Sequence, residues 1–416
     1  MAESPQVNHA AQPLDHKTAG DVSYAAHLSV APMMDWIDNE KPARGSATIR
    51  VRCNKMLHSV QKLGQISLKS WETEQMVEHA NPIKIVRADV NCAACLSVAP
   101  MMDWTDRHCR YFHRLMSKQA LLYTEMVTAP AVIHGDRARL LDFSAAEHPL
   151  AIQLGGSNPA QLAQAARIAA DWGYAEVNLN CGCPSDRVQS GSFGAVLMEN
   201  AGLVADCVAA MRAVVDVPVT VKCRIGVDDQ VPAAILPDFL AQVSAAGCDR
   251  FTIHARKAWL KGLSPKENRD IPPLDYDLVH EMKGLFPHLH VSVNGGVADL
   301  DAARGFLDRG LDGVMIGRAA YHTPAEVLLN ADAEIFGGGE SHSAEDIVHL
   351  MLPYIEAHLQ TENGRLQQVT RHMLGLFQGR PGARMWRRYL SENVHRDGAD
   401  SRVVLDALAY VTKESA

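Results

Sequence analysis

Two cysteines that stand two residues apart are the most reactive groups that the sequence places at the end of a predicted strand. Cys181 and Cys183 lie in the segment NLNCGCPSDRVQ, residues 178–189. A thiol can attack as a nucleophile or donate a proton, whereas a zinc site needs about four ligands. No second Cys or His pair at ligand spacing accompanies them, and Cys92-x-x-Cys95 is equally isolated, so we expect no metal. Cys181 suits a buried strand end, and Cys183 suits the loop that follows it.

Polar and charged side chains end several further apolar runs. One polar strand end has little meaning, because every strand must become polar where it meets water. Lysine, histidine and arginine at one strand end after another indicate a site, since a lysine inside a ring of strands needs a partner or a function. Glycines after the last two runs would let backbone N–H groups approach an anion. The set comprises Gln153, Asn178, Asn180, Lys222, Arg224, His254, Arg256, Asn294-Gly295-Gly296 and Gly317-Arg318.

Eight short apolar or β-branched runs would carry these residues, with alanine-rich helical stretches between them. Asn158-Pro159 opens one such helix, because Asn is a good N-cap and Pro fits the first helical position. Eight strands that each lead into a helix predict an α/β fold, the (β/α)8 TIM barrel, whose active site lies where the strands end. An open doubly wound sheet is the alternative, which eight continuous units disfavour. The runs are 96–101, 121–127, 150–156, 176–182, 217–226, 250–256, 290–297 and 313–320.

The pattern changes at both ends of this region. After residue 340 the strand pattern stops and amphipathic helical stretches run to residue 416. We therefore expect a barrel over residues 96–335, a separate helical domain over 340–416 and an extension of doubtful structure over 1–95.

An internal repeat complicates the start of the barrel. The segment LSVAPMMDW occurs at 28–36 and again at 96–104. Only the second copy leads into a helix and a further strand, so we predict that it supplies the first strand. We interpret the first copy as a duplicated exon or an error of gene prediction, with a genuine additional domain as the alternative.

The composition is typical of a globular protein, with 47% hydrophobic and 21% charged residues. Nine cysteines spread over 416 residues indicate reduced thiols rather than a disulfide framework. The sequence has no apolar run of membrane-spanning length and no secretory signal, so we expect a cytoplasmic protein without a membrane partner. The net charge of -8 gives no support to nucleic-acid binding.

One local segment does support binding to a nucleic acid. Residues 371–391 contain no Asp or Glu, and a helix would bring three of their arginines to one face. A solvated basic face is the ordinary explanation, but such a segment in an acidic protein favours phosphate binding. We expect Trp386 to be a core residue. The arginines are Arg371, Arg380, Arg384, Arg387 and Arg388.

The longer motifs, taken in order, resemble those of the tRNA-dihydrouridine synthases, within them the branch that acts on uridines 20 and 20a of the D-loop. The resemblance covers residues 96–416. The motifs that carry it are APMMDWTDRHCR, YTEMV, HPLAIQLGG, NLNCGCPSDRVQ, VTVKCRIGVDD, IHARKAWLKGLSPKENRDIPPL, NGG, GVMIGRAAY and RHMLGLFQGRPGARMWRRYLSEN.

The resemblance implies that FMN binds in the barrel mouth, that NADPH is the reductant and that tRNA is the substrate. It makes Cys183 the catalytic acid, which would protonate C5 of uracil while hydride reaches C6. Asn180 would contact the extruded base, and Lys266, Arg269, Arg384 and Arg387 would contact tRNA. The protein is expected to be a monomer. The cofactor-binding residues that it implies are Pro100, Met101, Met102, Gln153, Lys222, His254, Asn294, Gly295, Gly296, Gly317 and Arg318.

Two other functions are compatible with parts of this pattern. An FMN barrel oxidoreductase of the dihydroorotate type would act on a small molecule, but it has no need of an arginine-rich helical domain. A non-catalytic RNA-binding relative has no need of Cys183, Lys222 and His254.

Overall fold

The structure, a computed structural model, describes residues 90–185 and 192–412. The first copy of the repeat, nearly all of the expected extension and residues 186–191 of the loop after the fourth strand lie outside the described residues. Eight strands form one sheet, as predicted, and the second copy of the repeat supplies the first of them. The strands are β1 (Leu96–Val98), β2 (Leu122–Thr128), β3 (Leu150–Gly155), β4 (Glu176–Cys181), β5 (Val219–Arg224), β6 (Arg250–His254), β7 (His290–Asn294) and β8 (Gly313–Ile316).

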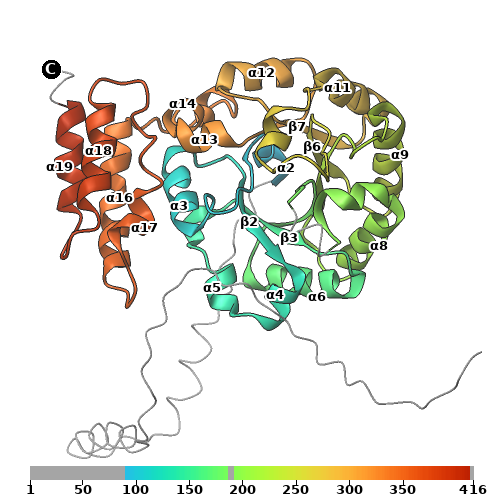
Figure 1. Cartoon of the computed structure of the whole chain (residues 1–416), viewed down its shortest axis with the longest axis horizontal. Coiled ribbons are helices and arrows are strands. Elements are labelled where there is room, and N and C mark those ends of the chain that lie inside the picture. The colour runs from blue at the N-terminus through green and yellow to red at the C-terminus, as the bar shows by residue number, and fades with distance from the viewer. Residues whose placement is uncertain (1–89, 186–191, 413–416) are drawn as a thin grey trace, which may run out of the picture. The chain divides into compact units, whose positions relative to one another are not determined.

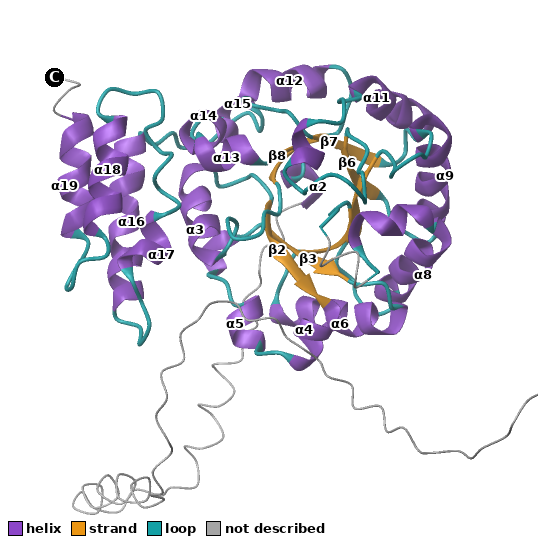
Figure 2. Ribbon diagram, viewed as in Figure 1, coloured by secondary structure: helices purple, strands orange, loops and turns teal. Residues whose placement is uncertain are grey.

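Every strand pairs in parallel with its neighbour in the order β1-β8-β7-β6-β5-β4-β3-β2. The ring closes through a parallel bridge between Ser97 and Leu121. The Val98 N–H donates to the Leu121 carbonyl oxygen across that seam at 3.0 Å. Figure 2 shows the ring of strands with helices around it. The fold is therefore the expected (β/α)8 barrel, and the open doubly wound sheet is excluded.

The helices between the strands follow the expected amphipathic pattern. Asn158 caps α6 by accepting from the Gln161 N–H at 3.0 Å, and Pro159 is the first helical residue. The apolar face of α6, from Leu162 to Ala169, packs in one cluster with Val177 and Leu179 of β4. The helical elements on the barrel are α2 (Val90–Ala93), α3 (Arg107–Met116), α4 (Ala129–His134), α5 (Arg137–Leu141), α6 (Pro159–Trp172), α8 (Ala201–Arg212), α9 (Pro232–Ala245), α10 (Glu267–Asp270), α11 (Tyr276–Leu285), α12 (Leu300–Asp308), α13 (Arg318–His322), α14 (Pro324–Leu328) and α15 (Ala331–Glu334), with short 3-10 turns at Ala145–Glu147 and Gly194–Glu199.

Side chains alternate along each strand, because successive residues point to opposite faces of a sheet. In β4 the apolar Val177, Leu179 and Cys181 belong to the cluster under the helices. Glu176, Asn178 and Asn180, which alternate with them, hydrogen-bond to side chains of β2, β5 and β3 respectively. One side of the barrel interior is therefore polar, which positions polar groups in layers below the barrel mouth.

From residue 344 to residue 412 the regular structure consists of helices. They are α16 (Ala344–Leu359), α17 (Leu366–Thr370), α18 (Ala383–Asn393) and α19 (Arg402–Thr412), shown in orange to red in Figure 1. Trp386 of α18 is fully buried, donates from Nε1 to the Met373 carbonyl oxygen at 3.1 Å and packs edge-on against Phe377. The prediction that Trp386 is a core residue is confirmed. Among the described residues, no helix has both the length and the apolar character that a membrane span requires.

Asp106 joins the barrel to these helices. Its carboxylate caps α3 by accepting from the His108 and Cys109 N–H groups. The same carboxylate accepts from Arg371 and lies 3.0 Å from His372 Nε2. These contacts lower the pKa of Asp106 well below its usual range, although its burial acts in the opposite direction.

Candidate active site

A cavity of about 650 Å³ opens at the carboxyl ends of the strands. All eight strands, or the residues directly after them, contribute to its wall, as the barrel fold leads one to expect. The sequence-predicted residues that line it are Pro100, Met101, Met102, Gln153, Asn180, Cys183, Lys222, His254, Arg269, Asn294, Gly295, Gly296, Gly317 and Arg318. Five other predicted residues, Asn178, Arg256, Lys266, Arg384 and Arg387, are not part of the described wall.

Cys183 lies on the loop that follows β4 and is half-buried. The side-chain oxygen of Asn180 accepts from the backbone N–H groups of Gly182 and Cys183, each at 3.0 Å. The Cys183 carbonyl oxygen accepts from the Ala195 N–H at 2.9 Å. These bonds fix the backbone on both sides of the thiol, whose Sγ lies 3.5 Å from Ser185 Oγ. Cys181, by contrast, is fully buried in the core, as expected.

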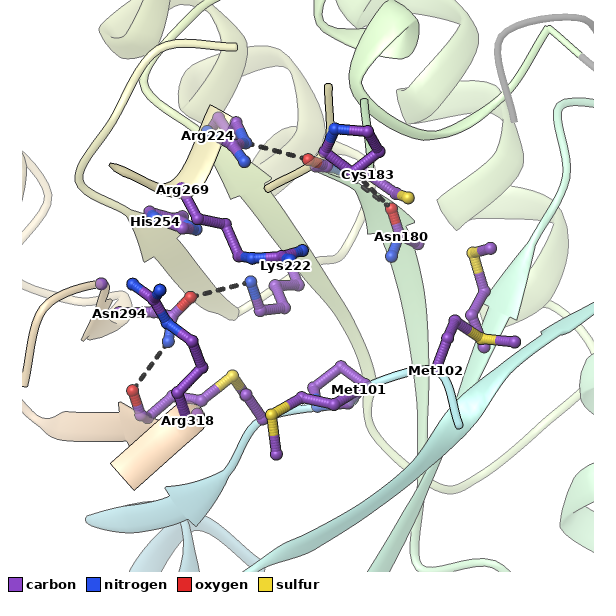
Figure 3. Close-up of a pocket in the computed structure, with 18 of the residues that line it drawn as sticks. Met101, Met102, Asn180, Cys183, Lys222, Arg224, His254, Arg269, Asn294 and Arg318 are labelled. Atoms are coloured by element: carbon purple, nitrogen blue, oxygen red, sulfur yellow. Dashed lines mark hydrogen bonds between the residues drawn. The ribbon is translucent and has the colours of Figure 1, made fainter. Parts of the chain in front are cut away.

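Lys222 stands on the strand next to this loop, in register with Asn180, and lines the cavity. Lys222 Nζ donates to Asn294 Oδ1 at 3.0 Å, and Asn294 Nδ2 donates to the Met315 carbonyl oxygen at 2.8 Å. Figure 3 shows Lys222 between Cys183 on one side and Asn294 with Arg318 on the other. Burial, and secondarily the nearby Arg224, lowers the pKa of Lys222 to about 8. The ammonium therefore gains from a negatively charged ligand.

Two glycines after β7 shape the wall beside Lys222. Gly295 and Gly296 have φ angles of 107° and 75°, which side chains rarely adopt. A Cβ on Gly295 would lie 2.8 Å from the His254 ring, and one on Gly296 would lie 2.6 Å from Tyr276 Oη. The chain thus exposes backbone where a side chain would collide. Loops after strands seven and eight commonly hold a phosphate in this fold, and Gly317-Arg318 stands after β8.

His254 stands at the end of β6, between these glycines and the arginines. Burial, followed by the charges of Arg224 and Lys222, lowers the pKa of His254 well below its usual range. The imidazole is therefore neutral at neutral pH, and it can donate to or accept from a ligand without adding charge.

Arg224 is a pocket residue whose importance the sequence did not reveal beyond its place as a polar strand end. It is 3% exposed and donates to the carbonyl oxygens of Gly182, Lys257 and Asn268 at 2.9 to 3.0 Å. It therefore ties the loop of Cys183 to the segment that carries Arg269. Its alternation with Lys222 on β5 was the available signal, because residues two apart in a strand share a face.

The arginines of the C-terminal helices differ in how their charge is compensated. Arg371 pairs with Asp106, Arg380 with Glu345, and Arg388 with Glu392. Within the described residues, Arg384 and Arg387 have no carboxylate partner, and Arg387 donates to the side-chain oxygen of Gln378. Three of the five arginines that suggested a basic face are thus neutralised.

The arrangement fits an anionic cofactor with a flat polar ring better than it fits a metal. Within residues 90–185 and 192–412, no cluster of His, Cys, Asp or Glu has the geometry of a metal site. The cavity volume lies in the range of small-molecule pockets. Its chemistry is a thiol on one side, a lysine and neutral histidine at the centre and exposed glycine backbone beside Arg318.

A family model and curated relatives both indicate similarity to dihydrouridine synthases. The family model described as dihydrouridine synthase (Dus) matches residues 97–412. A tRNA-dihydrouridine(20/20a) synthase of Vibrio parahaemolyticus is 59% identical over 321 residues, which are 77% of this chain and 97% of that protein. The protein of the same name from Escherichia coli is 58% identical over 327 residues, or 78% and 94% of the two chains. Among solved structures, morphinone reductase superposes with a TM-score of 0.42 at 14% identity, covering 61% of this chain and 88% of that one.

Proposed function

Since the chain belongs to the dihydrouridine synthase family, we propose that it reduces uridine to 5,6-dihydrouridine in tRNA, at positions 20 and 20a of the D-loop. The observation that carries the proposal is the placement of Cys183 and Lys222 in the wall of one cavity at the barrel mouth. A base of the D-loop must leave its stack to enter such a cavity, which costs less for an unpaired base than for a paired one.

Each part of the cavity has a role in this proposal. FMN, re-reduced by NADPH, would supply the hydride that reaches C6 of the base. The side chains and backbone that would hold FMN belong to Pro100, Met101, Met102, Gln153, Lys222, His254, Asn294, Gly295, Gly296, Gly317 and Arg318, with the glycines and Arg318 on its phosphate.

Cys183 holds the proton that C5 of the base receives. A thiol positioned beside the base can donate a proton as a general acid. Asn180 keeps the Cys183 backbone in place and contacts the base with its amide. Lys266, Arg269, Arg384 and Arg387 bind tRNA phosphates, and the protein acts as a cytoplasmic monomer.

Replacement of the thiol tests this proposal. We expect the Cys183→Ala variant to retain the visible absorption of flavin and to lose dihydrouridine formation by a factor of about 100 or more, the usual contribution of general acid catalysis. The assay is dihydrouridine content of tRNA from a strain that lacks the modification. Cys92→Ala, at an exposed cysteine, is the matched control.

Two results would contradict the proposal. Equal product formation by Cys183→Ala would remove the acid role. A wild-type protein that reduces a free pyrimidine but leaves tRNA unchanged would favour the small-molecule oxidoreductase.

A further inference from the structure

A chain of hydrogen-bonded side chains runs from the floor of the barrel to the loop of Cys183. We call it the barrel network. It begins at the Glu176 carboxylate, which accepts from Thr220 Oγ1 and pairs with Arg250. It ends at Asn180, below Cys183. Its members are Glu176, Thr220, Asn178, Gln153 and Asn180, all at most 7% exposed.

The direction of every bond in the barrel network follows from its lower end. A carboxylate paired with an arginine can only accept, so the Thr220 hydroxyl must donate to Glu176. The Thr220 oxygen is then the acceptor for Asn178 Nδ2, at 2.8 Å. This contact turns the Asn178 oxygen towards Gln153, whose Nε2 donates to it at 2.8 Å.

The contacts of Asn180, at the upper end of the barrel network, require the same donor-to-acceptor direction along the chain of bonds. Gln153 Oε1 accepts from Asn180 Nδ2 at 2.7 Å. The Asn180 oxygen is thereby left for the backbone N–H groups of Gly182 and Cys183, which can only donate. Two obligatory partners, a carboxylate below and backbone N–H groups above, thus fix three amide orientations between them.

The consequence reaches the ligand. Gln153 and Asn180 line the cavity, and each amide nitrogen carries two hydrogens. The barrel network uses one hydrogen of each, while the Gln153 oxygen accepts from Asn180 and the Asn180 oxygen accepts from the backbone N–H groups of Gly182 and Cys183. The cavity wall at β3 and β4 therefore presents N–H donors, which suit the carbonyl oxygens of a pyrimidine or a flavin ring.

We propose that Thr220 and Asn178 are positioning residues, which set the amide orientation of Gln153 and Asn180 and through Asn180 hold the backbone at Cys183. Neither residue needs to contact a ligand. The activity readout of this inference rests on the proposed function. A second readout, the rate at which iodoacetamide alkylates Cys183 in the purified holoprotein, does not.

The test compares Thr220→Val with Thr220→Ser. Valine keeps the volume of the side chain but can neither accept from Asn178 nor donate to Glu176, so Asn178 loses the contact that orients its amide and the network is held from its upper end alone. We expect kcat for dihydrouridine formation to fall about tenfold, which equals about 1.4 kcal/mol in the barrier, with a smaller change in KM for tRNA. Alkylation of Cys183, followed by peptide mass spectrometry, should be faster. Serine restores the hydroxyl and should restore both values.

Two variants separate positioning from general loss of stability. Tyr123→Phe removes another donor to the same Glu176 oxygen, 2.8 Å away, without touching the amides. Thr252→Val changes a buried threonine of the adjacent strand outside the barrel network. Both should keep the kcat and the alkylation rate of the wild type.

The proposal is overturned if Thr220→Val matches the wild type in both readouts, if serine fails to restore them, or if the two controls lose as much as Thr220→Val. Should Thr220→Val not fold, Thr220→Ala is measured against the same controls. A wild-type protein that forms no dihydrouridine would contradict the proposed function, while the alkylation rates would still decide the role of Thr220.

Discussion

Arg224 at the barrel mouth and three arginines of the C-terminal helices hold their charge in opposite ways, although Arg318 at the mouth is also paired with a carboxylate, that of Asp270. Arg224 is bound by three backbone carbonyl oxygens, which are neutral acceptors and leave its positive charge uncompensated. Arg371, Arg380 and Arg388 are each bound by a carboxylate, which cancels their charge. A count of arginines therefore says little about the electrostatic potential of a surface, and the partner of each arginine decides it.

The largest effect in this comparison is expected at Arg224. Arg224→Met removes the charge and the donors to three carbonyl oxygens, so the loop of Cys183 loses its connection to Lys257 and Asn268. We expect dihydrouridine formation to fall by roughly a hundredfold, the cost of a misplaced catalytic group. Arg224→Lys retains the positive charge but not the three carbonyl contacts, so its rate of dihydrouridine formation should lie between those of the wild type and Arg224→Met. Full turnover by Arg224→Met, with unchanged circular dichroism, would mean that the charge at the mouth is not used.

The charge of Lys222 should make the affinity of the protein for FMN depend on pH. Its pKa is lowered to about 8, so above that pH the free protein carries a neutral amine there. An anionic ligand favours the ammonium, and binding above pH 8 must then take up a proton. The affinity of the apoprotein for FMN should thus fall as pH rises past 8, by up to about tenfold per pH unit. Lys222→Met should remove this dependence. The measurement is fluorescence titration with FMN, and an equally steep decline in the variant would contradict the assignment.

The smallest effect is expected on the C-terminal helices. Arg384→Ala combined with Arg387→Ala should weaken tRNA binding and lower the salt dependence of log Kd by roughly 1 per phosphate contact. Arg380→Ala combined with Arg388→Ala removes the same formal charge from arginines that already have carboxylate partners. This pair should change the slope much less. Equal slopes for the two double variants would show that ion pairing on this surface does not matter for tRNA.

The sequence predicted the architecture well because the signals for it are local. Short apolar or β-branched runs mark all eight strands, and Asn158-Pro159 marks the start of a helix. Most of the cavity wall followed from the same pattern, since a residue at a strand end must lie at the barrel mouth. Ion pairs between residues that are distant in the sequence could not be predicted from such local signals. Glu345 is 35 residues from Arg380, and Asp106 is 265 residues from Arg371.

The barrel network was missed for a related reason. Glu176, Thr220 and Gln153 each resemble an ordinary polar residue in an apolar run, and only the register of β3, β4 and β5 brings them together. The register pairs Gln153 with Asn178, and Asn178 with Thr220. If consecutive strands are assumed to pair in chain order, and alternate residues of a strand to face the same side, the sequence is enough to suggest that Gln153, Asn178 and Thr220 meet.

The shared contacts of Asp106 have a consequence for how the protein unfolds. One carboxylate holds the first turn of α3 and also binds Arg371 and His372, so neither set of partners can be released without disturbing the other. Barrel and C-terminal helices should therefore melt as one cooperative unit rather than in sequence. These contacts should resist acid, because the lowered pKa of Asp106 keeps its carboxylate ionised at pH values where an ordinary aspartate is protonated.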